Sequence, residues 1–208
     1  MDAPTDEQIL ADYPSGGGGL DILVRRYHRE LFQFVLRFTN SSAAAEDVVQ
    51  ETFLQVHLSA GAFDPSRRFK PWLYTIAANK ARDWLRARSR RGEVPLDAKV
   101  GGQADGTLSF ADLLADDQPD HEQQLEADEK RQLVQRVVGQ MPDALREMLV
   151  LGYFHRFAYK EMADILDIPL GTVKSRLHSA VSHFARQYRA AAAAGSKDVF
   201  EQGLPSNS

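Results

Sequence analysis

The side chains best suited to chemistry by type and spacing include a group of hydroxyl and basic residues in the last third of the chain. They share a predicted helix with a buried stripe, since apolar residues recur at three- and four-residue steps from Val173 to Tyr188. Hydroxyl, ammonium and guanidinium groups bind phosphates and base edges. We therefore predict a contact surface for duplex DNA. Its residues are Thr172, Lys174, Ser175, Arg176 and Ser179.

A second group lies in a predicted helix from Lys70 to about Arg90, beside the aromatic residues Trp72 and Tyr74. Arginine and aromatic side chains together suit unstacked bases and single-strand phosphates. The pattern also fits a solvated basic helix whose aromatic residues lie in the core. Residues at steps of three and four form a basic face on this helix. They are Thr75, Asn79, Arg82, Arg86 and Arg90.

An acidic face marks the predicted helix from Ala43 to Leu58. Carboxylates near a helix N-terminus are favoured by the helix dipole, so a solvated surface explains this face equally well. The face and its flank consist of Glu46, Asp47, Gln50, Glu51 and Leu54.

No residue pattern indicates catalysis or metal binding, so we expect neither an enzyme nor a cofactor. The chain has no cysteine, which excludes disulfides and thiolate metal sites. Its six histidines form no HExxH pair, and no glycine-rich phosphate loop or nucleophile elbow occurs. No apolar run approaches the roughly 20 residues of a membrane span, and the acidic N-terminus has no signal pattern. We expect a cytoplasmic protein.

The elements that position these groups are all helical. Helices are predicted from Thr5 to Tyr13, where Thr5 and Gln8 form a capping box, and from Leu20 to Phe38. Further helices start near residues 121, 142 and 159. The pair at 159–188 has a turn at Asp167–Pro169 and is typical of a helix-turn-helix whose second helix enters the major groove.

Charge divides the chain into blocks, although the net charge is only −4. Residues 61–99 hold ten Lys/Arg against four Asp/Glu, residues 100–130 hold one against nine, and residues 131–193 hold nine against five. Local charge governs contact with phosphates, so the overall sign does not exclude nucleic acid. We predict two small all-α domains, 1–91 and 121–190, an acidic flexible linker over 92–120, and a frayed tail over 191–208.

Four segments in order resemble the sigma-70 family of bacterial transcription initiation factors. They are AEDVVQETFLQVH, FDPSRRFKPWLYTIAANKARDWLR, MPDALREMLVLGYF and YKEMADILDIPLGTVKSRLHSA. The two-domain form resembles the extracytoplasmic-function (ECF) subgroup, and the likeness covers about 20–91 and 125–188. It implies a region 2-like helical bundle and a region 4-like helix-turn-helix domain.

The resemblance implies a sigma factor that directs core RNA polymerase to promoters. The acidic face of 46–54 would contact the beta-prime clamp helices, and the beta flap is a further expected contact. The loop from Asp64 to Lys70 would capture a flipped base, and the start of the last helix would read the −35 element. The residues implied for the −10 element and its melting are Arg67, Arg68, Lys70, Trp72, Asn79, Lys80, Arg82 and Arg86.

Three positions depart from the pattern. Asp167 stands where the turn usually has glycine, although aspartate tolerates a left-handed backbone. Ala158 replaces a capping Ser or Thr, so the helix after it is expected to start less firmly. The glycine run at 16–19 reads as a flexible loop of unassigned role.

The main alternative is a helix-turn-helix regulator that binds duplex DNA without core polymerase. It accounts for 158–188 but leaves the basic-aromatic helix and the acidic face unexplained. Many members of the subgroup are held by an anti-sigma protein, and the sequence does not say whether this chain has such a partner. A monomer is expected for the free protein by resemblance.

Overall fold

The computed structural model describes residues 4–13, 18–91 and 121–202, and every regular element among them is helical. The first part holds α1 (Asp6–Asp12), α2 (Leu20–Thr39), α3 (Ser42–Ser59), the short 3₁₀ turn η2 (Ala60–Ala62) and α4 (Phe69–Arg90). The second holds α6 (His121–Gly139), α7 (Asp143–Leu149), the π-helical turn η3 (Val150–Phe154), α8 (Tyr159–Leu166) and α9 (Leu170–Gln202). The all-α prediction is confirmed, and the predicted linker lies outside the described residues.

Local signals set the helix ends where the sequence predicts them. The Thr5 hydroxyl and the Gln8 amide form the predicted capping box of α1. The Ser41 hydroxyl accepts a hydrogen bond from the backbone N–H of Ala44 and caps α3. Asp167 has φ 52° and ψ 51°, so the helix-turn-helix keeps its left-handed turn residue without glycine. At the uncapped start of α8, the Glu161 carboxylate accepts from the backbone N–H of Ala158 at 2.9 Å.

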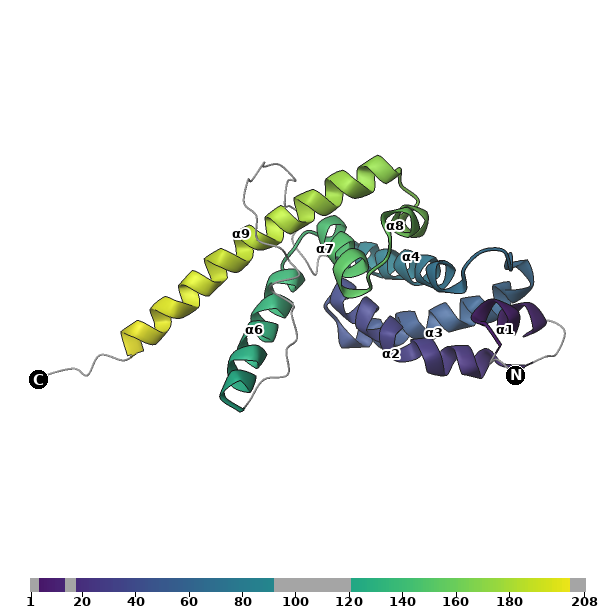
Figure 1. Ribbon diagram of the computed structural model, residues 1–208, viewed down its shortest axis with the longest axis horizontal. Helices are drawn as coiled ribbons and strands as arrows, with labels where there is room; N and C mark the ends of the chain where they lie inside the picture. The colour runs from purple at the N-terminus through teal and green to yellow at the C-terminus, as the bar shows by residue number, and fades with distance from the viewer. Residues whose placement is uncertain (1–3, 14–17, 92–120, 203–208) are drawn as a thin grey trace, which may run out of the picture.

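The last helix differs from the prediction, because α9 runs through the expected tail as far as Gln202. The alanine run at 190–194 explains the extension, since alanine has the highest helix propensity and a single glycine costs about 1 kcal/mol. In Figure 1 this helix extends well beyond the body of the molecule.

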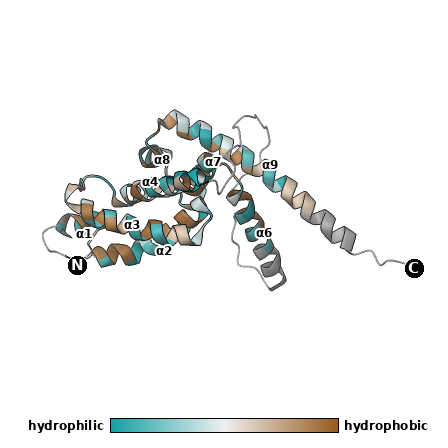
Figure 2. Ribbon diagram, turned by 180° about the vertical axis from the view of Figure 1, so that it is seen from behind, coloured by the Kyte–Doolittle hydropathy of each residue, from teal (hydrophilic) through white to brown (hydrophobic). Residues whose placement is uncertain are grey.

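One hydrophobic core joins the two predicted domains. Helices α2, α3 and α4 pack into a bundle, with α1 at its side, and α8 lies across α4 (Figure 1). Figure 2 shows apolar and hydrophilic residues side by side on the bundle helices, as expected for amphipathic elements. The core includes Phe34, Tyr74 and Leu73 from the first part and Met148, Leu149 and Phe184 from the second. The two parts therefore form one packed unit.

Gly19 explains part of the glycine run whose role the sequence left open. It caps the start of α2 with φ 92°, a conformation that glycine adopts at little cost. A Cβ at this position would lie 2.9 Å from Cγ2 of Ile9 on α1. Glycine therefore permits the close approach of α1 to the bundle.

Candidate nucleic-acid interface

The start of α9 presents its polar residues on the side opposite the core. Val173 and Leu177 are buried, whereas Lys174 and Arg176 are exposed. The hydroxyl of Ser175 donates to the carbonyl of Thr172 at 3.1 Å, and that of Ser179 donates to the carbonyl of Ser175 at 3.0 Å. Thr172, Ser175 and Ser179 therefore share the outward side of the helix, and Lys174 and Arg176 lie on its two flanks, where their charges suit phosphates and bases.

Helix α4 carries most of the predicted −10 residues, but most of its basic side chains form pairs with other side chains. The Arg82 guanidinium donates to the Asn79 side-chain oxygen at 2.9 Å. Arg86 pairs with Asp83 at 2.8 Å on the same helix, and the Lys80 ammonium lies 3.3 Å from the Glu51 carboxylate. These pairs are exposed or half-exposed, and exposed pairs contribute little stability, so nucleic acid can displace them.

The loop before α4 is ordered by its own side chains. The Asp64 carboxylate accepts from the backbone N–H of Ser66 at 2.9 Å, and this hydrogen bonding lowers the pKa of Asp64. Arg67 and Arg68 are exposed on it. Trp72 is half-buried between Phe63 and Phe69, with ring centroids 5.0 and 6.1 Å away. Trp72 therefore belongs to an aromatic cluster that supports the loop.

The second half of the chain covers part of this basic surface. Glu161 of α8 pairs with Arg68 at 2.5 Å, and Glu147 of α7 pairs with Arg82 at 2.9 Å. Glu147 is only 6% exposed, and burial raises its pKa against the opposing attraction of Arg82. Two residues predicted to bind the −10 strand thus contact carboxylates from the −35 half.

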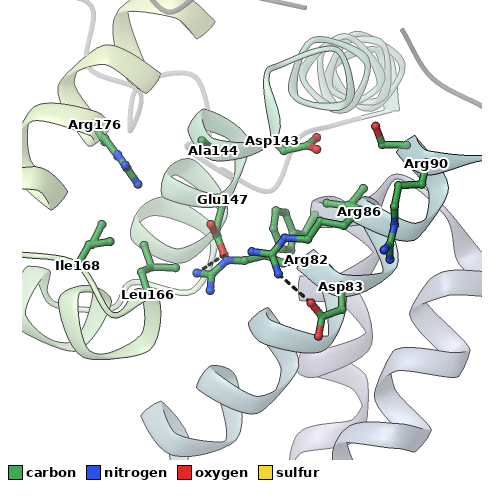
Figure 3. A pocket seen from close by; sticks show the side chains of 13 residues that line it. Arg82, Asp83, Arg86, Arg90, Asp143, Ala144, Glu147, Leu166, Ile168 and Arg176 are labelled. Carbon is green, nitrogen blue, oxygen red and sulfur yellow. Dashed lines mark hydrogen bonds and ion pairs between the residues drawn. The ribbon is translucent and has the colours of Figure 1, made fainter. Parts of the chain in front are cut away.

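A cleft of about 940 Å³ lies at this junction, and Figure 3 shows its lining side chains. Arg82, Arg86 and Arg90 enter from α4, Glu147 stands on α7, and Arg176 points in from α9 (Figure 3). Basic residues predicted for the −10 and −35 elements therefore face one cleft.

A buried polar group closes the other side of the junction. His155, which follows η3, lies with its Nδ1 3.0 Å from the Tyr74 hydroxyl and 3.4 Å from the Glu30 carboxylate. Lys70, another predicted −10 residue, pairs with the same carboxylate at 2.6 Å. Burial lowers the pKa of His155 to about 4, against the opposing attraction of Glu30, so the imidazole is neutral at pH 7. Rings of Phe34 and Tyr74 pack against it at 5.5 and 5.3 Å.

The acidic face of α3 is exposed along its whole length. Glu46, Asp47, Gln50 and Glu51 all face outward, and Leu54 is 57% exposed beside them. The structure adds Leu58, which is 68% exposed one turn later and is not among the residues predicted from the sequence. An i, i+4 pair of exposed leucines next to carboxylates is the signal that identifies it. This face has the apolar centre and charged margin of a protein contact.

The sequence patterns also do not identify the residues from the second half of the chain that contact the −10 surface. Glu147, Glu161 and His155 lie 65, 93 and 81 residues from the α4-side groups that they contact. No local spacing relates residues so far apart. Among the described residues, no His, Asp or Glu cluster could hold a metal ion, and none of the described helices is long and apolar enough to cross a membrane.

Comparisons with known proteins agree with the arrangement of helices. Residues 23–91 match the family model of sigma-70 region 2, and residues 131–184 match that of sigma-70 region 4. RNA polymerase sigma-H factor of Pseudomonas aeruginosa is 32% identical over 176 residues, covering 84% of this chain and 89% of that protein. The ECF RNA polymerase sigma factor SigW of Bacillus subtilis is 30% identical over 80% of this chain and 87% of its own length.

Among solved structures, CnrH in complex with the cytosolic domain of CnrY shares the fold. Its TM-score is 0.59 at 24% identity, with 88% of this chain and 96% of that chain covered. A sigma factor RpoE in complex with the anti-sigma factor NepR from Bartonella quintana also has a TM-score of 0.59, at 20% identity over 81% and 96% of the chains. The two family models match in order and the relatives cover most of the chain, so this protein belongs to the sigma-70 family of RNA polymerase sigma factors, in its extracytoplasmic-function subgroup.

Proposed function

We propose that this protein binds core RNA polymerase through the exposed face of α3, opens the −10 element with α4 and the loop before it, and reads the −35 element with the start of α9. Family membership carries the general function, promoter-specific initiation by core polymerase. The assignment to residues is supported by one observation. Three chemically distinct surfaces lie on three helices, each facing away from the hydrophobic core.

The apolar and acidic face of α3 suits a protein partner. Leu54 and Leu58 present apolar area that is otherwise left in water, and Asp47 and Glu51 flank it. Interfaces commonly combine an apolar centre with a charged rim, and the charges steer the partner. We assign this face to the clamp helices of core polymerase.

The basic surface of α4 suits a melted strand. Asn79 carries an amide suited to base edges, and Arg86 carries a charge for phosphates. A loop that takes up an extruded base must offset a few kcal/mol of unstacking, which stacking and hydrogen bonds supply. The −35 element remains duplex, because a helix with exposed hydroxyl and basic residues reads intact major grooves.

The closed junction gives this function an order of events. Arg68 and Arg82 contact carboxylates of the second half in the closed arrangement, and Arg176 faces the cleft at the junction. We propose that core polymerase separates the two halves before promoter DNA binds. On this proposal, the free protein carries two DNA surfaces and is nevertheless expected to bind duplex DNA poorly.

The remaining assignments follow from the family. Sigma factors are not themselves enzymes, and we propose no catalytic activity and a place in the cytoplasm, where RNA polymerase works. Relatives of this fold have been solved with CnrY and with the anti-sigma factor NepR. We include an anti-sigma protein among the partners of this chain. Its binding would keep the junction closed.

The test is run-off transcription from the host's own promoter fragments with purified protein and bacterial core polymerase. Transcripts are expected only when both components are present. Asp47→Ala with Glu51→Ala is expected to abolish core binding, whereas Lys174→Ala with Arg176→Ala is expected to weaken the −35 contact and leave core binding intact. Asp21→Ala, which removes an exposed ion pair with Arg25 on α2, is the control. Tight duplex binding by the protein alone, without transcripts or core binding, would favour the free-standing regulator.

A further inference from the structure

The short helix α1 precedes the region matched by the family model and packs against the loop before α4. We propose that Glu7 of α1 is a positioning residue for promoter opening, because it fixes the start of α4 and with it the loop before that helix. The proposal rests on the function proposed above, in which the loop at 64–70 captures a base.

Helix α4 has no cap of its own. Its N-cap residue, Arg68, makes no side-chain hydrogen bond to the helix start. The backbone N–H of Phe69 instead donates to Oε1 of Glu7 at 2.9 Å, across 62 residues of sequence. The N-terminus of a helix carries unsatisfied N–H groups and partial positive charge, so a carboxylate is a favourable partner. Glu7 therefore determines where the loop ends and α4 begins.

The backbone of Glu7 is itself held in place. The neighbouring Asp6 carboxylate accepts hydrogen bonds from the Tyr27 hydroxyl and from Arg26, both on α2. Ile9 and Leu10 are 5% and 0% exposed in the core. Helix α1 is thus fixed to the bundle, and the cap on α4 is delivered from a rigid support.

A cleft of about 510 Å³ opens between α1 and the loop. Gln8 and Asp12 line one side and bring an amide and a carboxylate, which match the donors and acceptors on a base edge. Pro65 and Arg67 line the other side, and a guanidinium stacks on base faces and binds phosphates. These walls suit the base and phosphate that the proposed function assigns to the loop, and the cap from Glu7 holds one wall in place.

The experiment measures binding of a fluorescent single-stranded −10 oligonucleotide to the holoenzyme, from a promoter found by run-off transcription. The oligonucleotide is used intact and with an abasic site at the captured position. Glu7→Ala is expected to weaken binding of the intact strand about tenfold, because the start of α4 loses the charge-assisted hydrogen bond that holds the loop. The abasic strand is expected to bind the variant and the unchanged protein equally. Glu7→Gln keeps an oxygen acceptor and should restore most of the binding.

Thermal unfolding and core binding of each variant separate positioning from folding, and Asp21→Ala serves as the matched carboxylate control on α2. Equal losses on intact and abasic strands, or no loss with Glu7→Ala, would overturn the role of Glu7. Failure of the unchanged holoenzyme to bind the intact strand would instead overturn the proposed function, and the inference with it.

Discussion

Replacing Arg82 with methionine is the sharpest test of the closed junction. Methionine keeps much of the aliphatic stem but removes the partner of the Glu147 carboxylate, which lies 2.9 Å away. In the closed form this carboxylate would remain buried without a counter-charge. Separation of the two halves would return it to water. Arg82→Met is therefore expected to favour the open form.

The size of the effect follows from burial. The Glu147 side chain is 8% exposed and that of Arg82 is 22% exposed, so the pair is largely buried. Removing one partner of a buried pair costs about 3–5 kcal/mol, and the partial exposure of Arg82 places this case near about 3 kcal/mol, roughly 100-fold in the closed–open equilibrium. Burial already raises the pKa of Glu147 despite Arg82. Adding Glu147→Gln should therefore recover most of the loss.

The assay uses the absence of native cysteine. Cysteines introduced at the exposed positions His28 on α2 and His178 on α9 carry a fluorescent donor and acceptor, and energy transfer reports separation across a urea titration. Arg86→Met is the matched control, because Arg86 pairs only with Asp83 on its own helix among the contacts described and both side chains are about 70% exposed. Its effect should stay within about 0.5 kcal/mol.

Two results would refute this reasoning. If Arg82→Met opened the junction no more easily than Arg86→Met, the buried pair would not hold the halves together. If the double variant Arg82→Met/Glu147→Gln were as open as the single variant, the loss would come from packing at Arg82 and not from an unpaired carboxylate.

Three further predictions use the same proteins. Acidification from pH 6.5 to 4 should weaken the closed form by up to about 3 kcal/mol, since a histidine with a pKa of about 4 when buried regains about 6.5 on exposure. The closed form is favoured above pH 6.5 and loses this contribution as His155 takes up a proton. Burial raises the pKa of Glu147, so protonation of Glu147 favours the closed form and opposes the effect of His155. The pH dependence of the unchanged protein is therefore compared with that of His155→Phe in the energy-transfer assay, and the difference gives the contribution of the histidine. Asp167→Val should destabilise the protein by about 2 kcal/mol in urea unfolding and Asp167→Gly by less than about 1 kcal/mol, because φ is 52°. Phe34→Ala should cost about 3–5 kcal/mol by the same measurement, since this ring is fully buried in the shared core.

Helix positions and their outward faces were predictable from the sequence, since they depend on neighbours within one or two turns. The capping box of Thr5 and Gln8 and the left-handed turn at Asp167 are found as predicted. The same local rule leaves Lys174 and Arg176 outside the buried stripe of α9. Only the end of α9 was misplaced, because its alanine run continues the helix beyond residue 190.

What the tertiary structure decides is which charges are paired and by whom. Arg82, Lys70 and Arg68 read as free cations in the sequence, and the fold gives each a carboxylate from elsewhere in the chain. The cap that Glu7 places on α4 has the same origin. Periodicity determines which side of a helix faces the core, because that property repeats every 3.6 residues. Partners across an interface depend on how whole helices pack, and no local pattern encodes that arrangement.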